Sequence, residues 1–191
     1  MTLSDIAYSR LASQQIAGTG FETVKDLVGW MCAMQAQDFA WWSGLSAADS
    51  GNALEMVKPE LVTEMAGNKA YWLNGSNHGK VENNSSVFLL PAYDEFLISY
   101  RDRGASLSPE IGKKTVSDNG IFRPVVVING QVKGLWKKTT TNAKVLVEVN
   151  LFQQPGKKVK NIIEEKALIF GSFLKKTTEV VITTLNNISK Q

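Results

Sequence analysis

The residues best suited to chemistry are two glutamines and an aspartate in the stretch "WMCAMQAQDFAWWSGLS", residues 30–46. Gln35 and Gln37 each offer one acceptor and two donors, so the pair can hold and orient a water molecule without being ionised. Two positions apart, they do not share a helix face, and they can converge only if a helix ends or frays there. Asp38 is adjacent and could supply a carboxylate. The alternative is that both glutamines cap a helix end or lie on its surface.

The first part of the chain reads as three helices followed by a β-hairpin. Apolar spacing predicts helices over 3–17, over 23–35 with a possible extension to Trp42, and over 46–58. The stretch "ELVTEMAGNKAYWLNG" then alternates around a Gly-Asn turn, which is typical of a hairpin. This order is that of a winged helix, so we expect a winged-helix domain over residues 1–75. Its core is expected to contain four aromatic residues: Trp30, Phe39, Trp41 and Trp42.

The second part has a different pattern and reads as a separate domain. Residues 76–86 are polar and are predicted to be a linker, and 87–191 to be a small α+β domain with a mainly antiparallel sheet. Asn129-Gly130 between two apolar runs is the strongest short hairpin signal, and residues 157–174 form an amphipathic pattern. The stretch "LLPAYDEFLISYRDR" reads as a strand end, a proline and a helix whose charged residues brace the two domains. The whole chain is therefore predicted to be of the α+β class.

Composition excludes several classes of protein. No apolar run approaches the roughly 18–20 residues of a membrane span, and the N-terminal sequence does not resemble a secretion signal, so we expect a cytoplasmic protein without a membrane partner. Cys32 lies in an apolar helical pattern and reads as a buried thiol, and His78 lies in a polar loop and reads as solvated. No cysteine–histidine cluster or glycine-rich phosphate loop is present, so neither a metal nor a cofactor is expected.

Charge is distributed unevenly along the chain. Residues 1–112 hold 7 Lys/Arg against 13 Asp/Glu, whereas residues 113–176 hold 13 Lys/Arg against 4 Asp/Glu. A basic second half indicates either an anionic partner or a solvated lysine-rich surface, and charge alone leaves both open.

Four stretches resemble a bacterial family of tandem winged-helix DNA-binding proteins: "SRLASQQIAG", "MCAMQAQD", "LLPAYDEFLISYRDR" and "GIFRPVVVINGQVKGLWKK". The characterised members of that family are DNA glycosylases that unhook interstrand crosslinks and excise bulky alkyl adducts. The resemblance implies that Gln35 and Gln37 are the catalytic Gln-x-Gln pair, which would position a water against the sugar of an alkylated nucleotide. Family members usually have about twice this length, and here the middle is missing, with a join around residues 37–39.

The resemblance also implies duplex DNA as a partner. The predicted recognition helix, 46–58, carries Asp49 and Glu55, which are unfavourable next to phosphates, so we do not expect it to read bases. Backbone contact is instead predicted for lysines of the basic half, although the same lysines could protect a sheet edge. These residues are Lys133, Lys137, Lys138, Lys157 and Lys158. Trp136 beside them could stack on a base but is expected in the core.

The resulting hypothesis is a DNA-binding, glycosylase-related protein of shortened form with weak or no catalysis. The alternative is a non-enzymatic structural or interaction protein without DNA binding, possibly a homodimer that covers the surface of the missing part.

Overall fold

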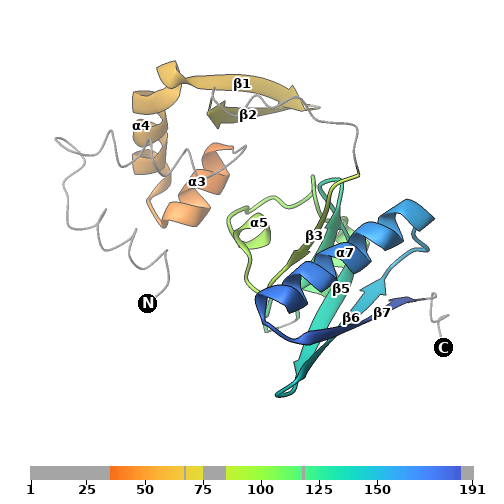
Figure 1. Cartoon of the computed structure of the whole chain (residues 1–191). Coiled ribbons are helices and arrows are strands. Elements are labelled where there is room, and N and C mark those ends of the chain that lie inside the picture. The colour runs from red at the N-terminus through yellow and green to blue at the C-terminus, as the bar shows by residue number, and fades with distance from the viewer. Residues whose placement is uncertain (1–34, 67, 75–84, 118, 186–191) are drawn as a thin grey trace. The chain divides into compact units, whose positions relative to one another are not determined.

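The computed structural model describes residues 35–66, 68–74, 85–117 and 119–185 of the chain (Figure 1). Contacts between Cα atoms divide these residues into two compact units. The first unit contains the described residues up to 74 together with Glu95–Asp102, and the second contains 85–94 and 103–185. The predicted linker and the helices predicted before residue 35 lie mostly or wholly outside the described residues, as do Trp30, Cys32 and His78.

Two helices form the core of the first unit. Helix α3 (Ala36–Ser43) ends at Gly44, whose φ of 71° is left-handed, and α4 (Ala47–Val57) begins after Ser46. The Ser46 hydroxyl accepts a hydrogen bond from the Asp49 backbone N–H at 3.1 Å and so caps α4. The buried side chains between the two helices are Phe39, Ala53, Leu54 and Val57. The helix predicted at 46–58 is thus confirmed.

A β-hairpin follows these helices. A short 3₁₀ turn, η1 (Lys58–Glu60), leads into strand β1 (Leu61–Ala66), which pairs antiparallel with β2 (Lys69–Asn74). The register pairs Ala66 with Lys69, so the hairpin predicted here is confirmed.

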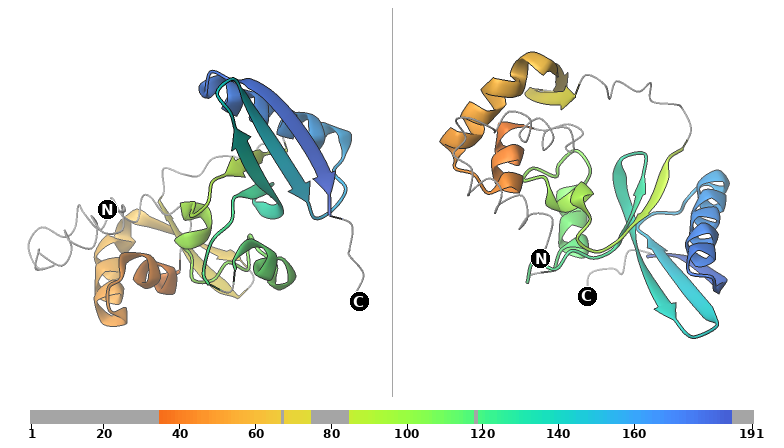
Figure 2. Two further views of the ribbon diagram at one scale, coloured as in Figure 1. Left: turned by 90° about the horizontal axis from the view of Figure 1, so that it is seen from below. Right: turned by 60° about the vertical axis from the view of Figure 1, so that its left-hand side comes forward.

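The second unit is a five-stranded sheet in the order β3-β4-β5-β6-β7 (Figure 2). The strands are β3 (Val87–Leu90), β4 (Val125–Ile128), β5 (Gln131–Thr140), β6 (Lys144–Leu151) and β7 (Thr177–Thr184). All neighbours are antiparallel except β6 and β7, which are parallel and are joined through helix α7 (Lys157–Phe173). The fold is therefore of the α+β class, and the sheet is mainly antiparallel.

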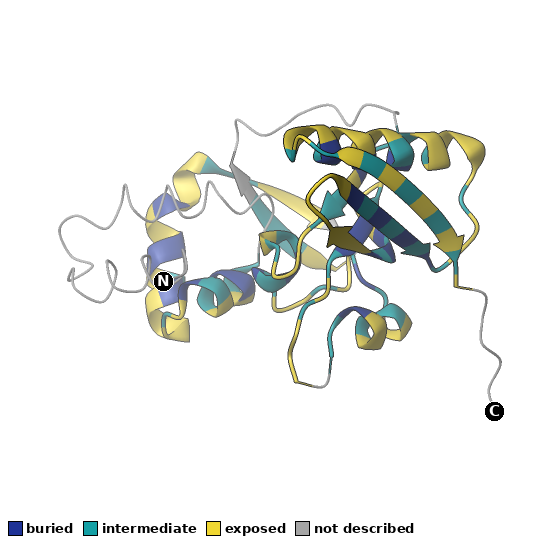
Figure 3. Cartoon of the chain, turned by 60° about the horizontal axis from the view of Figure 1, so that its bottom comes forward, coloured by how far each residue is buried: buried dark blue, intermediate teal, exposed yellow. Residues whose placement is uncertain are grey.

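The core of the second unit lies between α7 and one face of this sheet. Burial alternates along β6, where Val145, Val147 and Val149 are fully buried and the residues between them are partly exposed (Figure 3). The Trp136 indole packs edge-on against Phe170 with ring centroids 5.6 Å apart, and its N–H donates to the Leu90 carbonyl at 2.7 Å. Trp136 is therefore a core residue, as predicted, and is not available to stack on a base.

The turn between β4 and β5 also follows the sequence pattern. Asn129 and Gly130 have φ angles of 50° and 73°, and a two-residue turn with both φ positive matches the right-handed twist of the strands it joins. The Asn129 side chain accepts from the Ser86 N–H at 2.9 Å, and this contact ties the turn to the start of β3. The hairpin predicted at this point is confirmed.

Two helical segments differ from the prediction. The helix predicted after Pro91 is reduced to α5 (Glu95–Ile98), because Tyr93 has a left-handed φ of 58° and cannot continue a helix. Helix α6 (Pro109–Thr115) was not predicted, although proline at the first position after Ser108 is a common helix start. None of the helices in the described part of the chain is long and apolar enough to span a bilayer.

Candidate functional site

The Gln-x-Gln segment lies at the start of α3. Gln35 has an extended backbone, with φ −97° and ψ 161°, and α3 begins at the next residue. The possible extension of one helix through Gln35 to Trp42 is therefore wrong, since Gln35 itself is not helical. Gln35 is half-buried and Gln37 is exposed in the first turn. A helix boundary between them is the condition under which the two amides can converge.

Asp38 is the group that fixes this boundary. Its side chain is only 1% exposed, and Oδ2 accepts a hydrogen bond from the Gln35 N–H at 3.0 Å. The other oxygen, Oδ1, accepts from the N–H groups of Arg101 and Asp102 at 3.0 and 3.3 Å. A buried carboxylate is stable only when it is hydrogen-bonded in this way. Asp38 is thus a structural group and not a free base for activating water.

The segment Glu95–Asp102 makes further contacts to α3 within the same unit. The Trp41 indole N–H donates to the Ile98 carbonyl at 3.0 Å, and that of Trp42 donates to the Glu95 carboxylate at 3.2 Å. Trp42 packs against the buried cluster, but Trp41 is 55% exposed and is therefore not the core residue that the sequence predicts. The charged residues of this segment thus contact elements that are remote in sequence.

At the end of the same segment, Asp102 is paired with Lys69 of β2. The hydrogen bond from the Lys69 ammonium and the negative charge of Asp102 raise the pKa of Lys69. Asp38 thus binds the backbone N–H groups of residues 101–102, and Lys69 of the hairpin pairs with the Asp102 side chain.

The five lysines predicted to contact DNA do not form one face. Lys137 and Lys138 are neighbours in β5, so their side chains leave the sheet on opposite faces. Lys137 pairs with Glu148 at 3.1 Å, and the Lys138 ammonium lies 5.2 Å from the centre of the Phe170 ring. Lys133 is half-buried, next to a register shift in the β4–β5 pairing, and its ammonium lies 3.4 Å from the Gln131 side-chain oxygen.

Lys157 and Lys158 are placed differently. Both are exposed in the first turn of α7, which has no acidic residue, and its N-cap, Gly156, provides no side-chain cap. The N–H groups of a helix start carry partial positive charge, which adds to that of the lysines. This is the most electropositive arrangement among the five predicted positions.

Comparisons with known proteins identify the family of the chain. A family model described as "DNA glycosylase AlkZ-like" matches residues 33–173, which include Gln35 and Gln37. The chain belongs to the AlkZ-like family. Among solved structures it is similar to the Streptomyces sahachiroi DNA glycosylase AlkZ, with 18% sequence identity and a TM-score of 0.65. No curated protein matches it.

The structural match covers 84% of this chain and 45% of AlkZ. The chain thus spans less than half of the length of that relative. At 18% identity, the match shows that the two proteins share a fold over this part. The resemblance inferred from the sequence is confirmed at the level of the family.

The structural role of Asp38 was missed by the sequence reasoning, which considered it only as a possible carboxylate for the chemistry. Its position three residues after Gln35 was a usable signal, because an acidic residue at that spacing commonly accepts from the backbone N–H of the N-cap residue. The amides of Arg101 and Asp102 leave no such signal, since any residue type supplies a backbone N–H.

Replacing Asp38 by asparagine tests the structural role of the carboxylate. The amide that replaces one oxygen cannot accept a hydrogen bond, so at least one buried N–H loses its partner, and we expect Asp38→Asn to lower the free energy of unfolding by about 1–3 kcal/mol. Glu165→Gln is the control, because Glu165 is exposed in the middle of α7, and a change within about 0.5 kcal/mol is expected there. The free energy of unfolding is measured by urea denaturation. An equally small decrease in both variants would contradict the structural role of Asp38.

Proposed function

We propose that the chain is a DNA-binding protein related to DNA glycosylases, with weak or no base-releasing activity. The observation that carries the proposal is the family match across the Gln-x-Gln segment, together with the exposed side chain of Gln37. In this proposal α3 and α4, joined by three residues that include Gly44, are the helix-turn-helix of a winged helix, and the β1–β2 hairpin is its wing.

The chemistry available at the proposed site is limited to positioning. With Asp38 occupied by three backbone N–H groups, the polar side chains that remain in the motif are the amides of Gln35 and Gln37. Gln35 is also the N-cap of α3, and its side chain takes part in a capping box with Asp38. Neutral amides can orient a water molecule and stabilise developing charge, but they are poor bases. Such a site would act only on a base that leaves easily, such as an alkylated, cationic purine, and it would act slowly.

DNA contact is proposed through the basic unit, not through α4. The exposed face of α4 carries Asp49 and Glu55, and Glu55 pairs with Lys58 at 2.7 Å. A helix with these charges repels phosphates. Lys157 and Lys158 at the start of α7 are better placed, because phosphates bind readily where lysines and free helix N–H groups occur together. Contacts of this kind would be largely independent of sequence.

The binding prediction concerns salt dependence. We expect binding to a plain duplex to weaken steeply with salt, and Lys157→Gln/Lys158→Gln to lower the slope of log Kd against log salt by about 1–2. Lys137→Gln/Lys138→Gln removes the same charge from the same unit. In the wild type the Lys137 and Lys138 ammonium groups already contact Glu148 and Phe170, so we expect this double variant to lower the slope less. Fluorescence anisotropy at several salt concentrations measures both.

Two results would count against this proposal. Equal slopes in the two double variants would show that total charge, and not the start of α7, determines binding. A wild-type protein that forms a dimer by light scattering and retains no DNA at low salt would favour the alternative of a non-enzymatic interaction protein. The exposed apolar residues of α7, Ile169 and Phe173 among them, are the surface that such a dimer could cover.

The catalytic prediction concerns Gln37. With a duplex that carries one N7-methylguanine and with protein in excess, we expect slow release of the base or none. Any release should fall by about 100-fold in Gln37→Ala, because a positioned donor is lost, while DNA binding is kept. Gln153→Ala is the control, since Gln153 is also exposed but lies outside the motif. Fast release that persists unchanged in Gln37→Ala would contradict the assignment of the amide pair.

A further inference from the structure

Strand β7 forms one edge of the five-stranded sheet and is the longer of its two edge strands. It spans eight residues, and within the described part of the chain it pairs with β6 alone. This pairing runs from one end of β7 to the other without a register shift. The sequence of the strand, "TTEVVITT", contains one charged residue and neither lysine nor proline. Proteins usually protect a sheet edge with lysine, proline, a bulge or a short strand, so β7 is an unprotected edge.

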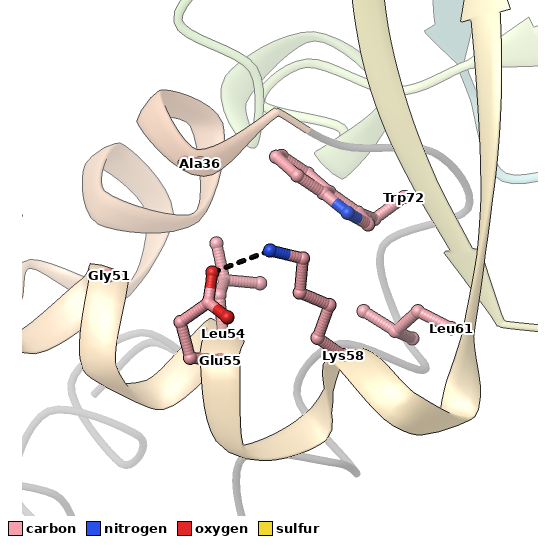
Figure 4. A pocket seen from close by; sticks show the side chains of 7 residues that line it. All are labelled: Ala36, Gly51, Leu54, Glu55, Lys58, Leu61 and Trp72. Carbon is pink, nitrogen blue, oxygen red and sulfur yellow. Dashed lines mark hydrogen bonds and ion pairs between the residues drawn. The ribbon is translucent and has the colours of Figure 1, made fainter.

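The other edge strands of the described residues differ from β7. At the opposite edge of the same sheet, β3 is four residues long and ends directly before Pro91. In the β1–β2 hairpin both strands carry charges, Glu64 in β1 and Lys69 in β2, and β1 begins next to the exposed pair of Lys58 and Glu55 (Figure 4). Short length, proline and charge each discourage pairing with another chain, and β7 has only one of these features, a single carboxylate.

The bonds between β7 and β6 identify the backbone groups that β7 directs outward. The Thr177 N–H donates to the Ala143 carbonyl at 3.1 Å, and the Leu185 N–H donates to the Leu151 carbonyl at 2.7 Å. Backbone groups alternate between the two sides of a strand, so the odd-numbered residues of β7 bond to β6 and the even-numbered residues face outward. The outward residues are Thr178, Val180, Ile182 and Thr184. An extended strand is the partner that can pair with such a row of groups.

A second copy of β7 fits this edge in the antiparallel direction. A two-fold axis perpendicular to the sheet at Val181 places Val180 opposite Ile182 of the other copy and Thr178 opposite Thr184. In this register every outward N–H and C=O of the strand gains a partner. We propose that two copies of the chain associate through their β7 strands, so that one sheet continues through both. The inference needs neither DNA nor the glutamine pair and therefore does not depend on the proposed function.

The side chains of β7 are complementary to themselves in this register. On the face covered by α7, Val180 and Ile182 already pack against the buried cluster, and pairing them across the axis continues that apolar surface. On the other face, Val181, which is 40% exposed, lies opposite its own copy. The Glu179 carboxylate lies opposite Thr183, and the two carboxylates of the dimer are four residues apart along the strands, roughly 13 Å. Apolar and β-branched side chains thus meet, and like charges do not.

Helix α7 is compatible with this pairing. It contacts both edge strands of the sheet, and it packs against β7 near its own C-terminus, where Gly171 leaves no space for a Cβ atom beside Thr178. In the dimer, Thr178 of one copy lies opposite Thr184 of the other, so the two Gly171 contacts are six residues apart along the strands, roughly 20 Å. This spacing exceeds the diameter of a helix with its side chains, about 10–12 Å. The close contact at Gly171 also holds β7 in place before the second copy binds.

Sedimentation of the full chain without DNA measures the association. We expect twice the 21.0 kDa mass of one chain at high micromolar concentration and the monomer mass after dilution. Thr183→Glu should raise the Kd of the dimer about three- to tenfold, because carboxylates at positions 179 and 183 then face each other twice. Adding Glu179→Lys to this variant should restore the Kd to within about threefold of the wild type, because opposite charges then face each other.

Thr139→Glu is the matched control for these variants. Thr139 is exposed in β5, and the pairs of Thr139 with Leu146 and of Leu146 with Glu179 place it on the same face of the sheet as Thr183. The substitution therefore adds the same charge to the same face, but away from the β7 edge. We expect its Kd to equal that of the wild type.

Amide hydrogen exchange on the wild-type protein tests the pairing without any variant. The outward N–H groups of Val180 and Ile182 should exchange at least about tenfold more slowly in concentrated than in dilute protein, because only the dimer bonds them. The Val181 N–H faces β6 and should exchange equally slowly at both concentrations in the range where the fold is intact. The alternation between neighbouring residues is specific to strand pairing.

The outcomes separate this inference from the proposed function. A monomer at all concentrations, a dimer that Thr183→Glu does not weaken, or a weakened dimer that Glu179→Lys does not restore would overturn the β7 pairing. Protection of Val180 and Ile182 that does not depend on concentration would also overturn it, since another segment of the same chain would then cover the edge. A β7 dimer that retains no DNA at low salt would support this inference and overturn the proposed function.

Discussion

The buried carboxylate of Asp38 is the interaction on which the rest of the proposed site depends. Removing a charge from water is unfavourable by several kcal/mol unless hydrogen bonds replace the solvent, and here backbone N–H groups from two segments do so. One group therefore sets where α3 begins, leaves Gln37 exposed in its first turn and attaches residues 101–102 to the same unit. The glutamine pair and the segment Glu95–Asp102 are positioned by the same two oxygens.

This arrangement separates the roles of the three polar residues in the motif. The carboxylate has a structural role, and Gln35 caps the start of α3. In the proposed function the chemistry therefore falls to neutral amides, which act by orientation and not by proton transfer. The lysines that we propose to contact phosphates lie in the second unit, at the start of α7. The family is established, and the chain corresponds to 45% of its solved relative AlkZ.

Much of the fold could be predicted because local patterns determine it. Alternation in β6, the Asn129-Gly130 turn and the amphipathic pattern of α7 each reflect side chains of that segment alone. The attachment of residues 101–102 to α3 could not, since it depends on hydrogen bonds from backbone N–H groups that lie 63 and 64 residues after Asp38. The division of Lys137 and Lys138 between opposite faces was predictable from the period of a strand, but the partners Glu148 and Phe170 were not.

Residue-resolved amide hydrogen exchange on the wild-type protein and on Asp38→Ala, which removes both carboxylate oxygens, tests the role of this carboxylate most directly. The account predicts that the N–H groups of Arg101 and Asp102 are protected in the wild type and exchange at least about tenfold faster in the variant, because opening then costs at least about 1.4 kcal/mol less. Protection of Val147 in the second unit should not change. Equal exchange at residues 101 and 102 in both proteins would contradict the claim that Asp38 holds the motif in place.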